Sequence, residues 1–342
     1  DVNKTLDSRP IADIGRGLQG AVAGVNITIP TGEVGSDPLI KIRGQVGSIS
    51  GNNTPLILLD NVEIPSIQMV NPNDVQSISV LKDAASSSIY GSKAAFGVIL
   101  ITTKSGAQSD KFEISYSNNF SWQDPAKKIE IGGIEALQYT LDAQTNRREP
   151  MPAGGFWRIS PESLEKAIEW QNLYGGKVKW NDPVVYGRDW FYDGKDKYGY
   201  RLYDGAKAMI KNWTPTMTHN LSVNGKSGKT SYNIGLGYLD QSGMSKTAKK
   251  DDFKRYNASV SVTSEINKYI TVRASSIYSD RNKRYPGIGN TTADPWLYLY
   301  RWSPLMPMGV TENGNPLKEP TYEMAAANTD NLQNKYYNIN LG

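Results

Sequence analysis

The sequence predicts an α/β domain that is followed by antiparallel strands of a transmembrane β-barrel. Residues 1–106 mix short apolar strand candidates with helix candidates, joined by connectors rich in Gly, Ser and Asn. After residue 111 the chain changes to segments in which apolar and polar residues alternate, the period of a strand with two different faces. The connectors between these segments are long and short in turn, as in barrels of the outer membrane.

The N-terminal domain is expected to begin with an amphipathic helix over residues 11–22, because Pro10 suits the first turn of a helix. Apolar strand candidates follow at residues 25–29, 39–43 and 55–59. The connectors 31–38 and 44–54 are rich in Gly, Ser and Asn, which predicts loops.

Residues 75–106 read as strand, helix, turn and second strand. Alternation over residues 75–82 predicts the first strand, and Asp83 can cap a short Ala/Ser helix that runs through Tyr90 and closes at Gly91. Residues 98–103 form an apolar, β-branched run, which is typical of a strand buried on both faces. Soluble α/β proteins can contain such a unit, so its local pattern does not define a function.

Six segments after residue 111 alternate like strands. In one of them Tyr232, Ile234 and Leu236 face one way, whereas Asn233 and Gly235 face the other. The candidates are residues 112–120, 217–223, 232–238, 256–262, 270–275 and 337–341. Segments of about nine to eleven residues suit a tilted membrane strand. A soluble antiparallel sandwich alternates in the same way, but its strands are shorter on average.

The lengths of the connectors favour the barrel over the sandwich. Taken in order, the connectors are residues 121–216 (very long), 224–229 (tight), 240–252 (intermediate), 264–267 (tight) and 279–334 (long). Outer-membrane barrels have short periplasmic turns and long extracellular loops, and a sandwich gives no reason for this alternation. The barrel is therefore the favoured interpretation, and a soluble sandwich is the alternative.

Composition excludes several classes of protein. The 342 residues carry a formal net charge of +4, which is too small to indicate nucleic-acid binding. The chain has no cysteine and a single histidine, which rules out a disulfide framework and thiolate zinc sites. It contains no apolar run long enough for a transmembrane helix. Because it starts at Asp1 and stops at Gly342 inside a strand candidate, we expect a piece of a longer protein.

No motif supports an enzyme, a cofactor or a metal. Residues 15–20 match G-x-G-x-x-G, but a helix is expected to run through them instead of starting at their end. Residues 228–230 resemble the end of a P-loop without its first glycine, and a hairpin turn explains them better. In residues 193–204, Lys195 and Lys197 occupy positions where calcium needs oxygen ligands. His219 lies on a strand candidate and is expected to be structural.

The two long connectors are rich in aromatic residues, for which we keep two interpretations. The aromatics build a small core of the loop itself, which is favoured, or they contact a ligand or partner. In the first connector they are Trp157, Trp170, Trp180, Trp190, Phe191, Tyr192, Tyr198, Tyr200, Tyr203 and Trp213. Residues 296–302 (WLYLYRW) in the second connector also suit an interfacial aromatic girdle.

The sequence of residues 10–106 closely resembles the plug domain of SusC/RagA-like TonB-dependent outer-membrane transporters. The matching segments are residues 18–25 (LQGAVAGV), 40–44 (IKIRG), 52–60 (NNTPLILLD), 71–83 (NPNDVQSISVLKD), 90–92 (YGS) and 97–100 (GVIL). Two segments depart from the family pattern: residues 60–63 (DNVE) and 92–97 (SKAAFG). These departures leave the plug assignment intact and weaken the transfer of individual residue roles.

The resemblance implies that residues 1–106 are a plug inside a barrel of about 22 strands, whose N-terminal part is residues 107–342. Such proteins actively import bulky nutrients, glycans or oligopeptides, across the outer membrane of Gram-negative bacteria, with the plug gating the barrel. The implied partners are TonB with its inner-membrane motor, a SusD-like surface lipoprotein that forms a lid, and outer-membrane lipid. Two transporter–lid pairs are also expected to form a dimer. The rest of the barrel and the segment that contacts TonB are expected outside this chain. The alternative function is an outer-membrane ligand receptor that signals with little transport.

Two sets of site residues follow from the resemblance. Arg43 and Lys93 are expected to pair with carboxylates of the barrel wall, a latch that holds the plug until force or ligand moves it. The loops 31–38 and 44–54 are expected to contact substrate, because Gly-rich backbone and Asn amides can satisfy polar ligands. Their candidate residues are Glu33, Ser36, Asp37, Ser48, Asn52 and Asn53. No catalytic residue, metal ligand, cofactor or nucleic-acid partner is expected.

Overall fold

The computed structural model describes residues 14–28, 34–42, 54–106, 112–125, 130, 132–147, 159–179, 182–192, 197–246, 250–285 and 304–305. The chain divides into two compact units. The first contains Asp1–Gln123, Trp213–Gly243 and Asp252–Arg284, and the second contains Asp124–Asn212, Met244–Asp251 and Tyr285–Gly342. Within the described residues, no helix is both long and apolar enough to cross a membrane.

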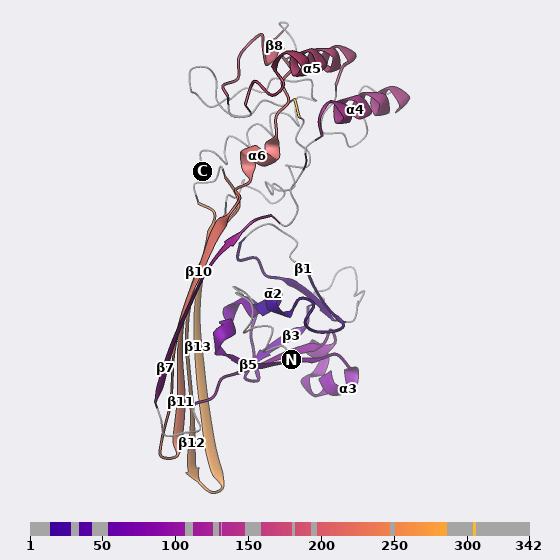
Figure 1. Cartoon of the computed structure of the whole chain (residues 1–342). Coiled ribbons are helices and arrows are strands. Elements are labelled where there is room, and N and C mark those ends of the chain that lie inside the picture. Colours follow the sequence, from indigo (N-terminus) through magenta and orange to yellow (C-terminus); the bar gives the residue numbers. More distant parts are fainter. Residues whose placement is uncertain are drawn as a thin grey trace. The chain divides into compact units, whose positions relative to one another are not determined.

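The N-terminal domain of the first unit is built on two small sheets (Figure 1). In one, β1 (Val25–Thr28) pairs antiparallel with β2 (Leu39–Ile42). The other has the strand order β4-β3-β6-β5, in which β3 and β6 run parallel and the other pairs antiparallel. Its strands are β3 (Leu56–Leu59), β4 (Val62–Glu63), β5 (Val75–Leu81) and β6 (Val98–Thr103).

The core of this domain forms where helix α2 (Ile14–Leu18) and both sheets bury their apolar side chains. The residues of this core are Ile14, Leu18, Ile27, Ile40, Ile42, Leu59, Ile67, Val70, Val75, Ile78, Ile99 and Ile101. The strand predicted at residues 75–82 is confirmed as β5, but its strict alternation is wrong: Val75 and Ile78 share this core, because a bulge shifts the register between Val75 and Ser77. The buried run predicted for β6 is confirmed, since Ile99 and Ile101 lie in this core and Val98 lies in a second one. Two 3₁₀ turns connect β4 to β5: η1 (Ile67–Met69) and η2 (Pro72–Asp74).

Two helix predictions were wrong in extent. The described part of the predicted helix 11–22 is only α2, because the chain turns at Gly20 with φ of 74°. Helix α2 covers the first four residues of the G-x-G-x-x-G segment and ends inside it, so no helix starts at the last glycine. The helix predicted from Asp83 to Tyr90 is a short α3 (Ala84–Ser87) that continues as a 3₁₀ segment, η3 (Ser88–Ala94), with a kink at Gly91 where φ is 69°.

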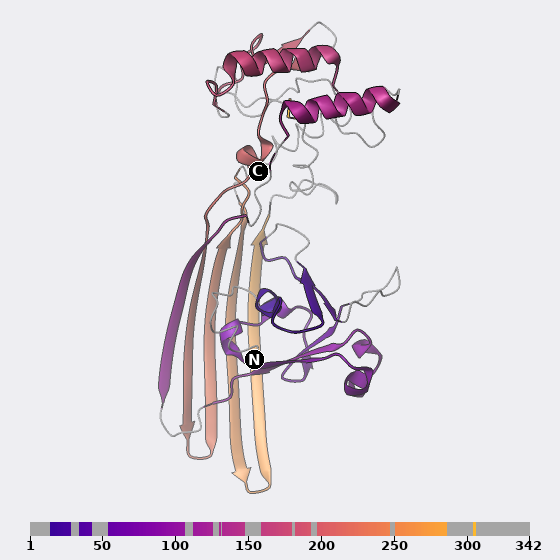
Figure 2. The ribbon, with the colours of Figure 1, turned by 45° about the vertical axis from the view of Figure 1, so that its right-hand side comes forward.

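Five long strands form the second part of the first unit, which we call the wall. They lie side by side in the order β13-β12-β11-β10-β7, and every neighbouring pair is antiparallel (Figures 1 and 2). The strands are β7 (Glu113–Gln123), β10 (Thr214–Ser227), β11 (Thr230–Ser242), β12 (Asp252–Asn267) and β13 (Ile270–Arg284). Five of the six alternating segments are therefore confirmed as strands, and residues 337–341 lie outside the described residues.

The wall strands are longer than the sequence pattern predicted. They contain 11 to 16 residues, because the polar residues at both ends continue the ladder of backbone hydrogen bonds. The tight turns are confirmed: Gly228 (φ 59°) and Lys229 join β10 to β11, and Lys268 and Tyr269 join β12 to β13.

The second unit contains most of the long connector after β7. Its elements are α4 (Ile134–Arg147), α5 (Pro161–Tyr174), β8 (Trp190–Tyr192), β9 (Lys197–Gly199) and α6 (Gly205–Met209). Leu137, Ile159, Leu164, Ala167 and Leu305 form a separate buried cluster. Trp170 and Tyr203 are also buried, whereas Phe191 and Trp213 are exposed, so only part of the aromatic set builds a core of the connector.

Candidate functional site

One face of the wall is bound to the N-terminal domain through polar side chains. The contacts converge on residues 66–74, which contain η1 and η2, and on Lys104 just after β6. Five wall residues donate these hydrogen bonds, namely Asn233, Arg255, Asn257, Ser259 and Arg281, and Asn220 accepts one. We call this set of contacts the docking interface. It links groups that lie at least 129 residues apart in the sequence, so we treat it as the candidate functional site.

Asp74 is the only acidic side chain in the 66–74 segment, and it is buried against the wall. The Ser259 hydroxyl donates to its Oδ2 at 2.8 Å. Gly235 makes this approach possible, because a Cβ there would lie 2.5 Å from both Asp74 Oδ1 and Ser259 Oγ. Burial raises the pKa of Asp74 above 3.8, and the Ser259 hydrogen bond and the charges of Lys104 and Arg255 oppose that rise.

Amide and guanidinium groups complete the docking interface. Asn71 Nδ2 donates to Asn220 Oδ1 at 2.9 Å, at a place where Gly237 leaves room for the Asn71 amide. Arg255 Nη1 donates to the carbonyl oxygen of Gln68 at 2.9 Å. Asn257 Nδ2 donates to the carbonyl oxygen of Met69 at 2.8 Å. Because 3₁₀ turns leave backbone carbonyls without helical partners, the wall satisfies groups that the turns expose.

Ion pairs lie at two further points between the domain and the wall. Arg281 Nη1 is 3.7 Å from Asp37 Oδ1, and Arg273 Nη2 is 3.7 Å from Asp60 Oδ1. In both, the cation is on the wall and the carboxylate is on the N-terminal domain. This polarity is opposite to that of the latch expected from the sequence.

The two expected latch residues have different positions in the structure. Lys93 lies at the surface, where its Nζ is 2.6 Å from Glu63 Oε2 of the same domain. Arg43 lies outside the described residues. The pairing of Arg43 and Lys93 with wall carboxylates stays a proposal.

Two of the six expected substrate-facing residues are described. Ser36 accepts a hydrogen bond from Lys283 of β13, with 3.1 Å between Nζ and Oγ. Asp37 accepts a hydrogen bond from the Ser66 hydroxyl and lies at the edge of a pocket. Glu33, Ser48, Asn52 and Asn53 lie outside the described residues.

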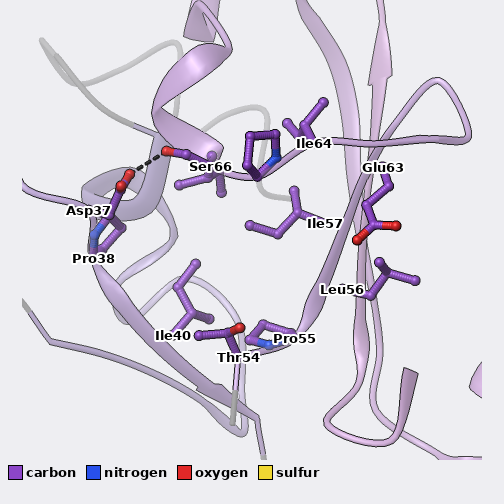
Figure 3. A pocket seen from close by; sticks show the side chains of 12 residues that line it. Asp37, Pro38, Ile40, Thr54, Pro55, Leu56, Ile57, Glu63, Ile64 and Ser66 are labelled. Atoms are coloured by element: carbon purple, nitrogen blue, oxygen red, sulfur yellow. Dashed lines mark hydrogen bonds between the residues drawn. The ribbon is translucent and has the colours of Figure 1, made fainter. Parts of the chain in front are cut away.

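The pocket has a volume of about 390 Å³ and lies between β2, β3 and residues 63–67. Figure 3 shows Asp37 with Ser66 on one side of it, Glu63 on the other, and Ile57 between them. Its remaining lining is mostly aliphatic: Pro38, Ile40, Pro55, Leu56, Ile64, Pro65 and Ile67, together with Thr54. The pocket therefore combines an apolar body with a carboxylate at each side.

Sequence reasoning missed the docking role of residues 66–74. The available signal was the segment Asn71-Pro72-Asn73-Asp74, in which Asn71 caps η2 by accepting from the Asn73 backbone N–H at 3.1 Å. The same polar residues suit an ordinary turn, so their pattern did not indicate an interface. Gly235 and Gly237 were recognised only as residues on the non-apolar face of a strand.

A buried charge cluster organises the second unit around Asp189. Its carboxylate pairs with Arg188 at 2.7 Å and with the fully buried Arg201 at 3.3 Å, and accepts from the Trp170 indole N–H at 3.0 Å. Burial opposes ionisation of Asp189, but hydrogen bonds from Arg188 and the Val185 backbone, with both arginine charges, hold its pKa below 3.8. These contacts indicate that the cluster has a structural role, because it joins Trp170 of α5 to Arg201.

His219 lies on β10, as predicted for a structural residue. Its Nδ1 is 2.8 Å from the Tyr116 hydroxyl, and its ring packs against Phe120 and Tyr238. Such contacts hold neighbouring strands together.

Comparison with known proteins defines the class. Residues 2–98 match the family model of the TonB-dependent Receptor Plug Domain. The N-terminal domain is therefore a plug, and the wall is a partial barrel.

Within this class the chain is SusC/RagA-like. It is 27% identical to TonB-dependent receptor P26 of Formosa agariphila over 97% of this chain and 30% of the relative. It is also 27% identical to TonB-dependent receptor SusC of Bacteroides thetaiotaomicron over 72% of this chain and 20% of that protein. The solved structure of the RagAB peptide transporter matches 95% of this chain and 35% of its own, with 28% identity and a TM-score of 0.63. The chain thus spans about a third or less of the length of these relatives.

Proposed function

We propose that the chain forms the plug and first wall strands of a transporter that actively imports bulky nutrients, glycans or oligopeptides, across the outer membrane of a Gram-negative bacterium. In this proposal residues 1–106 are the plug and residues 107–342 are the N-terminal part of the barrel. The docking interface carries the proposal. A plug that must be held in place and also move needs many moderate polar contacts and few strong buried ion pairs, because each hydrogen bond contributes only about 1 kcal/mol.

The opposite face of the wall supports contact with lipid. Side chains that alternate with the docking residues are apolar and exposed in this chain: Tyr116, Phe120, Leu236, Tyr256, Val260 and Tyr278. Strands of 11 to 16 residues are long enough to cross a bilayer, for which a tilted strand needs roughly 9 to 11 residues. The long connectors are then extracellular and the tight turns periplasmic.

The partners are proposed from the relatives. TonB with its inner-membrane motor supplies the energy, and a SusD-like lipoprotein forms the lid, with transporter–lid pairs able to dimerise. The neighbour RagAB is described as a peptide importer, which favours oligopeptides among the two substrate classes.

Plug gating is part of the same proposal, and Arg43 and Lys93 remain its candidate latch. The wall carboxylates that they require would lie on strands outside the described residues. Replacing Arg43→Ala in the full-length transporter should change uptake of its nutrient, with Lys82→Ala as a matched change of charge on the plug. Uptake equal to that of the wild type would remove Arg43 from the gate.

The test of import compares cells with and without TonB. Cells that express the full-length protein receive a labelled oligopeptide library or a labelled maltooligosaccharide series, and accumulated label is measured. Import predicts accumulation that disappears when TonB is deleted. Ligand-dependent transcription with little accumulation would instead identify a signalling receptor. Recovery of the full-length protein in the aqueous phase on membrane fractionation would refute both.

A further inference from the structure

The plug pocket of Figure 3 has the chemistry of a site for a lysine side chain. From its lining we infer that it binds an alkylammonium group of the imported substrate, the side chain of a lysine in an oligopeptide. The identification of this ligand as a substrate rests on the proposed import function. The binding itself depends only on the pocket.

The first support is the shape and polarity of the pocket. Its volume of about 390 Å³ lies within the usual range for ligand sites. Ile40, Ile57 and Ile64 form apolar walls that suit the four-carbon stem of lysine. No aromatic ring lies among the described lining residues, so these residues offer no flat apolar surface on which a sugar ring would stack.

The second support is that each carboxylate keeps an oxygen for a new cation. Asp37 Oδ1 accepts from the Ser66 hydroxyl, and among the described residues no donor lies on Oδ2. Glu63 uses Oε2 for Lys93, and no described donor lies on Oε1. The side chains of Asp37 and Glu63 are 59% and 52% exposed, so a ligand reaches both without unfolding the plug.

The third support is the position of Arg281, which connects the pocket to the wall. Its Nη1 donates to Ser66 Oγ at 3.0 Å and lies 3.7 Å from Asp37, too far for a hydrogen bond to that carboxylate. An ammonium group in the pocket would hydrogen-bond to the Asp37 carboxylate directly and would compete with Arg281 for electrostatic attraction to that carboxylate. Occupation of the pocket would thus weaken one contact between plug and wall, on the side of the plug where Ser36 also meets Lys283.

The test measures binding to the full-length protein in detergent by isothermal titration calorimetry at low salt. The probe is trilysine with both ends blocked. Two further peptides define the chemistry: the same peptide with acetylated ε-amines, and triglycine with a free amino terminus. We expect blocked trilysine to bind and the acetylated peptide to bind at least tenfold more weakly. Binding of triglycine with equal affinity would assign the site to terminal amines and overturn the lysine assignment.

Variants locate the site. Asp37→Asn and Glu63→Gln should each weaken trilysine binding about fivefold, the upper range for exposed ion pairs. Arg281→Ala should strengthen it up to fivefold because a competing cation is removed, whereas Lys229→Ala, an equal charge change in an exposed turn, should not. Thr54→Phe should abolish binding by filling the pocket while both carboxylates remain. Unchanged affinity in Asp37→Asn, Glu63→Gln and Thr54→Phe would refute the inference.

The outcome is separable from that of the import test. TonB-dependent uptake in a protein that does not bind trilysine would refute the pocket and leave import intact. Trilysine binding in a protein without TonB-dependent uptake would support the pocket and refute import.

Discussion

Gly235→Ala is the sharpest test of the docking interface. The new Cβ would lie 2.5 Å from Asp74 Oδ1 and from Ser259 Oγ, whereas ordinary contacts begin near 3.4 Å. Both groups must therefore move away from it by about 1 Å, which disrupts the 2.8 Å hydrogen bond between them. Loss of a hydrogen bond to a carboxylate costs about 1.5 to 3 kcal/mol, so docking of residues 66–74 should weaken by about 2 kcal/mol.

Hydrogen exchange of two plug amides reports this change. The Asp74 N–H donates to the Asn71 carbonyl, and the Lys104 N–H donates to the Asp74 carbonyl at 2.8 Å. A loss of about 2 kcal/mol should speed exchange of these amides about thirtyfold, if the plug segment opens from the wall before exchange. The exchange of amides in α5 should stay unchanged.

A double-mutant cycle identifies the cause of the effect. In an Asp74→Ala background the added methyl group meets no carboxylate, and the Ser259 hydroxyl has no carboxylate bond to hold it beside that methyl, so Gly235→Ala should add less than about 0.5 kcal/mol. Additive effects of the two substitutions would show that the alanine acts on the strand itself. That result would refute the role of Gly235 in receiving Asp74.

The remaining predictions concern charges. The pKa of Asp74 is raised on docking, so docking is strongest below pH 3.8 and weakens as the pH rises through the raised pKa. Hydrogen exchange of the Lys104 amide should follow this weakening, and Asp74→Asn should remove its dependence on the protonation of Asp74. Asp189→Asn leaves the buried Arg201 without its carboxylate and should lower the free energy of unfolding of the second unit by about 3 to 5 kcal/mol, measured by limited proteolysis. Asp142→Asn, at an exposed position, should change this free energy by less than about 0.5 kcal/mol. The pKa of Asp189 is lowered, so its stabilisation is present above pH 3.8 and lost as pH falls through the lowered pKa; equal resistance to protease across that range would contradict this.

The sequence predicted the architecture of the wall well. Alternation in the segment around Tyr232 and Gly235 places large apolar side chains on one face of β11 and small or polar ones on the other. This pattern arises because successive side chains of a strand point in opposite directions, so no distant contact is needed to recognise it. Strand ends were less predictable, since the polar residues there, such as Lys226 and Asp240, are equally common in turns.

The docking interface could not be predicted in the same way. Asp74 and Ser259 are 185 residues apart, and Asn71 and Asn220 are 149 residues apart. Each is an unremarkable polar residue in its own segment. Only the register of β10, β11 and β12 brings Gly235, Gly237 and Ser259 opposite the 3₁₀ turns.

Local patterns thus determined the kind of elements and their class, an α/β plug next to long two-faced strands, because side-chain period and turn residues act over a few positions. Tertiary structure decided which polar groups meet. It placed Asp37 and Glu63 at the two sides of one pocket, paired Lys93 with Glu63, and put wall arginines beside plug carboxylates. The physical reason is that hydrogen bonds and ion pairs depend on distances of a few ångströms between segments far apart in sequence, which no local pattern specifies.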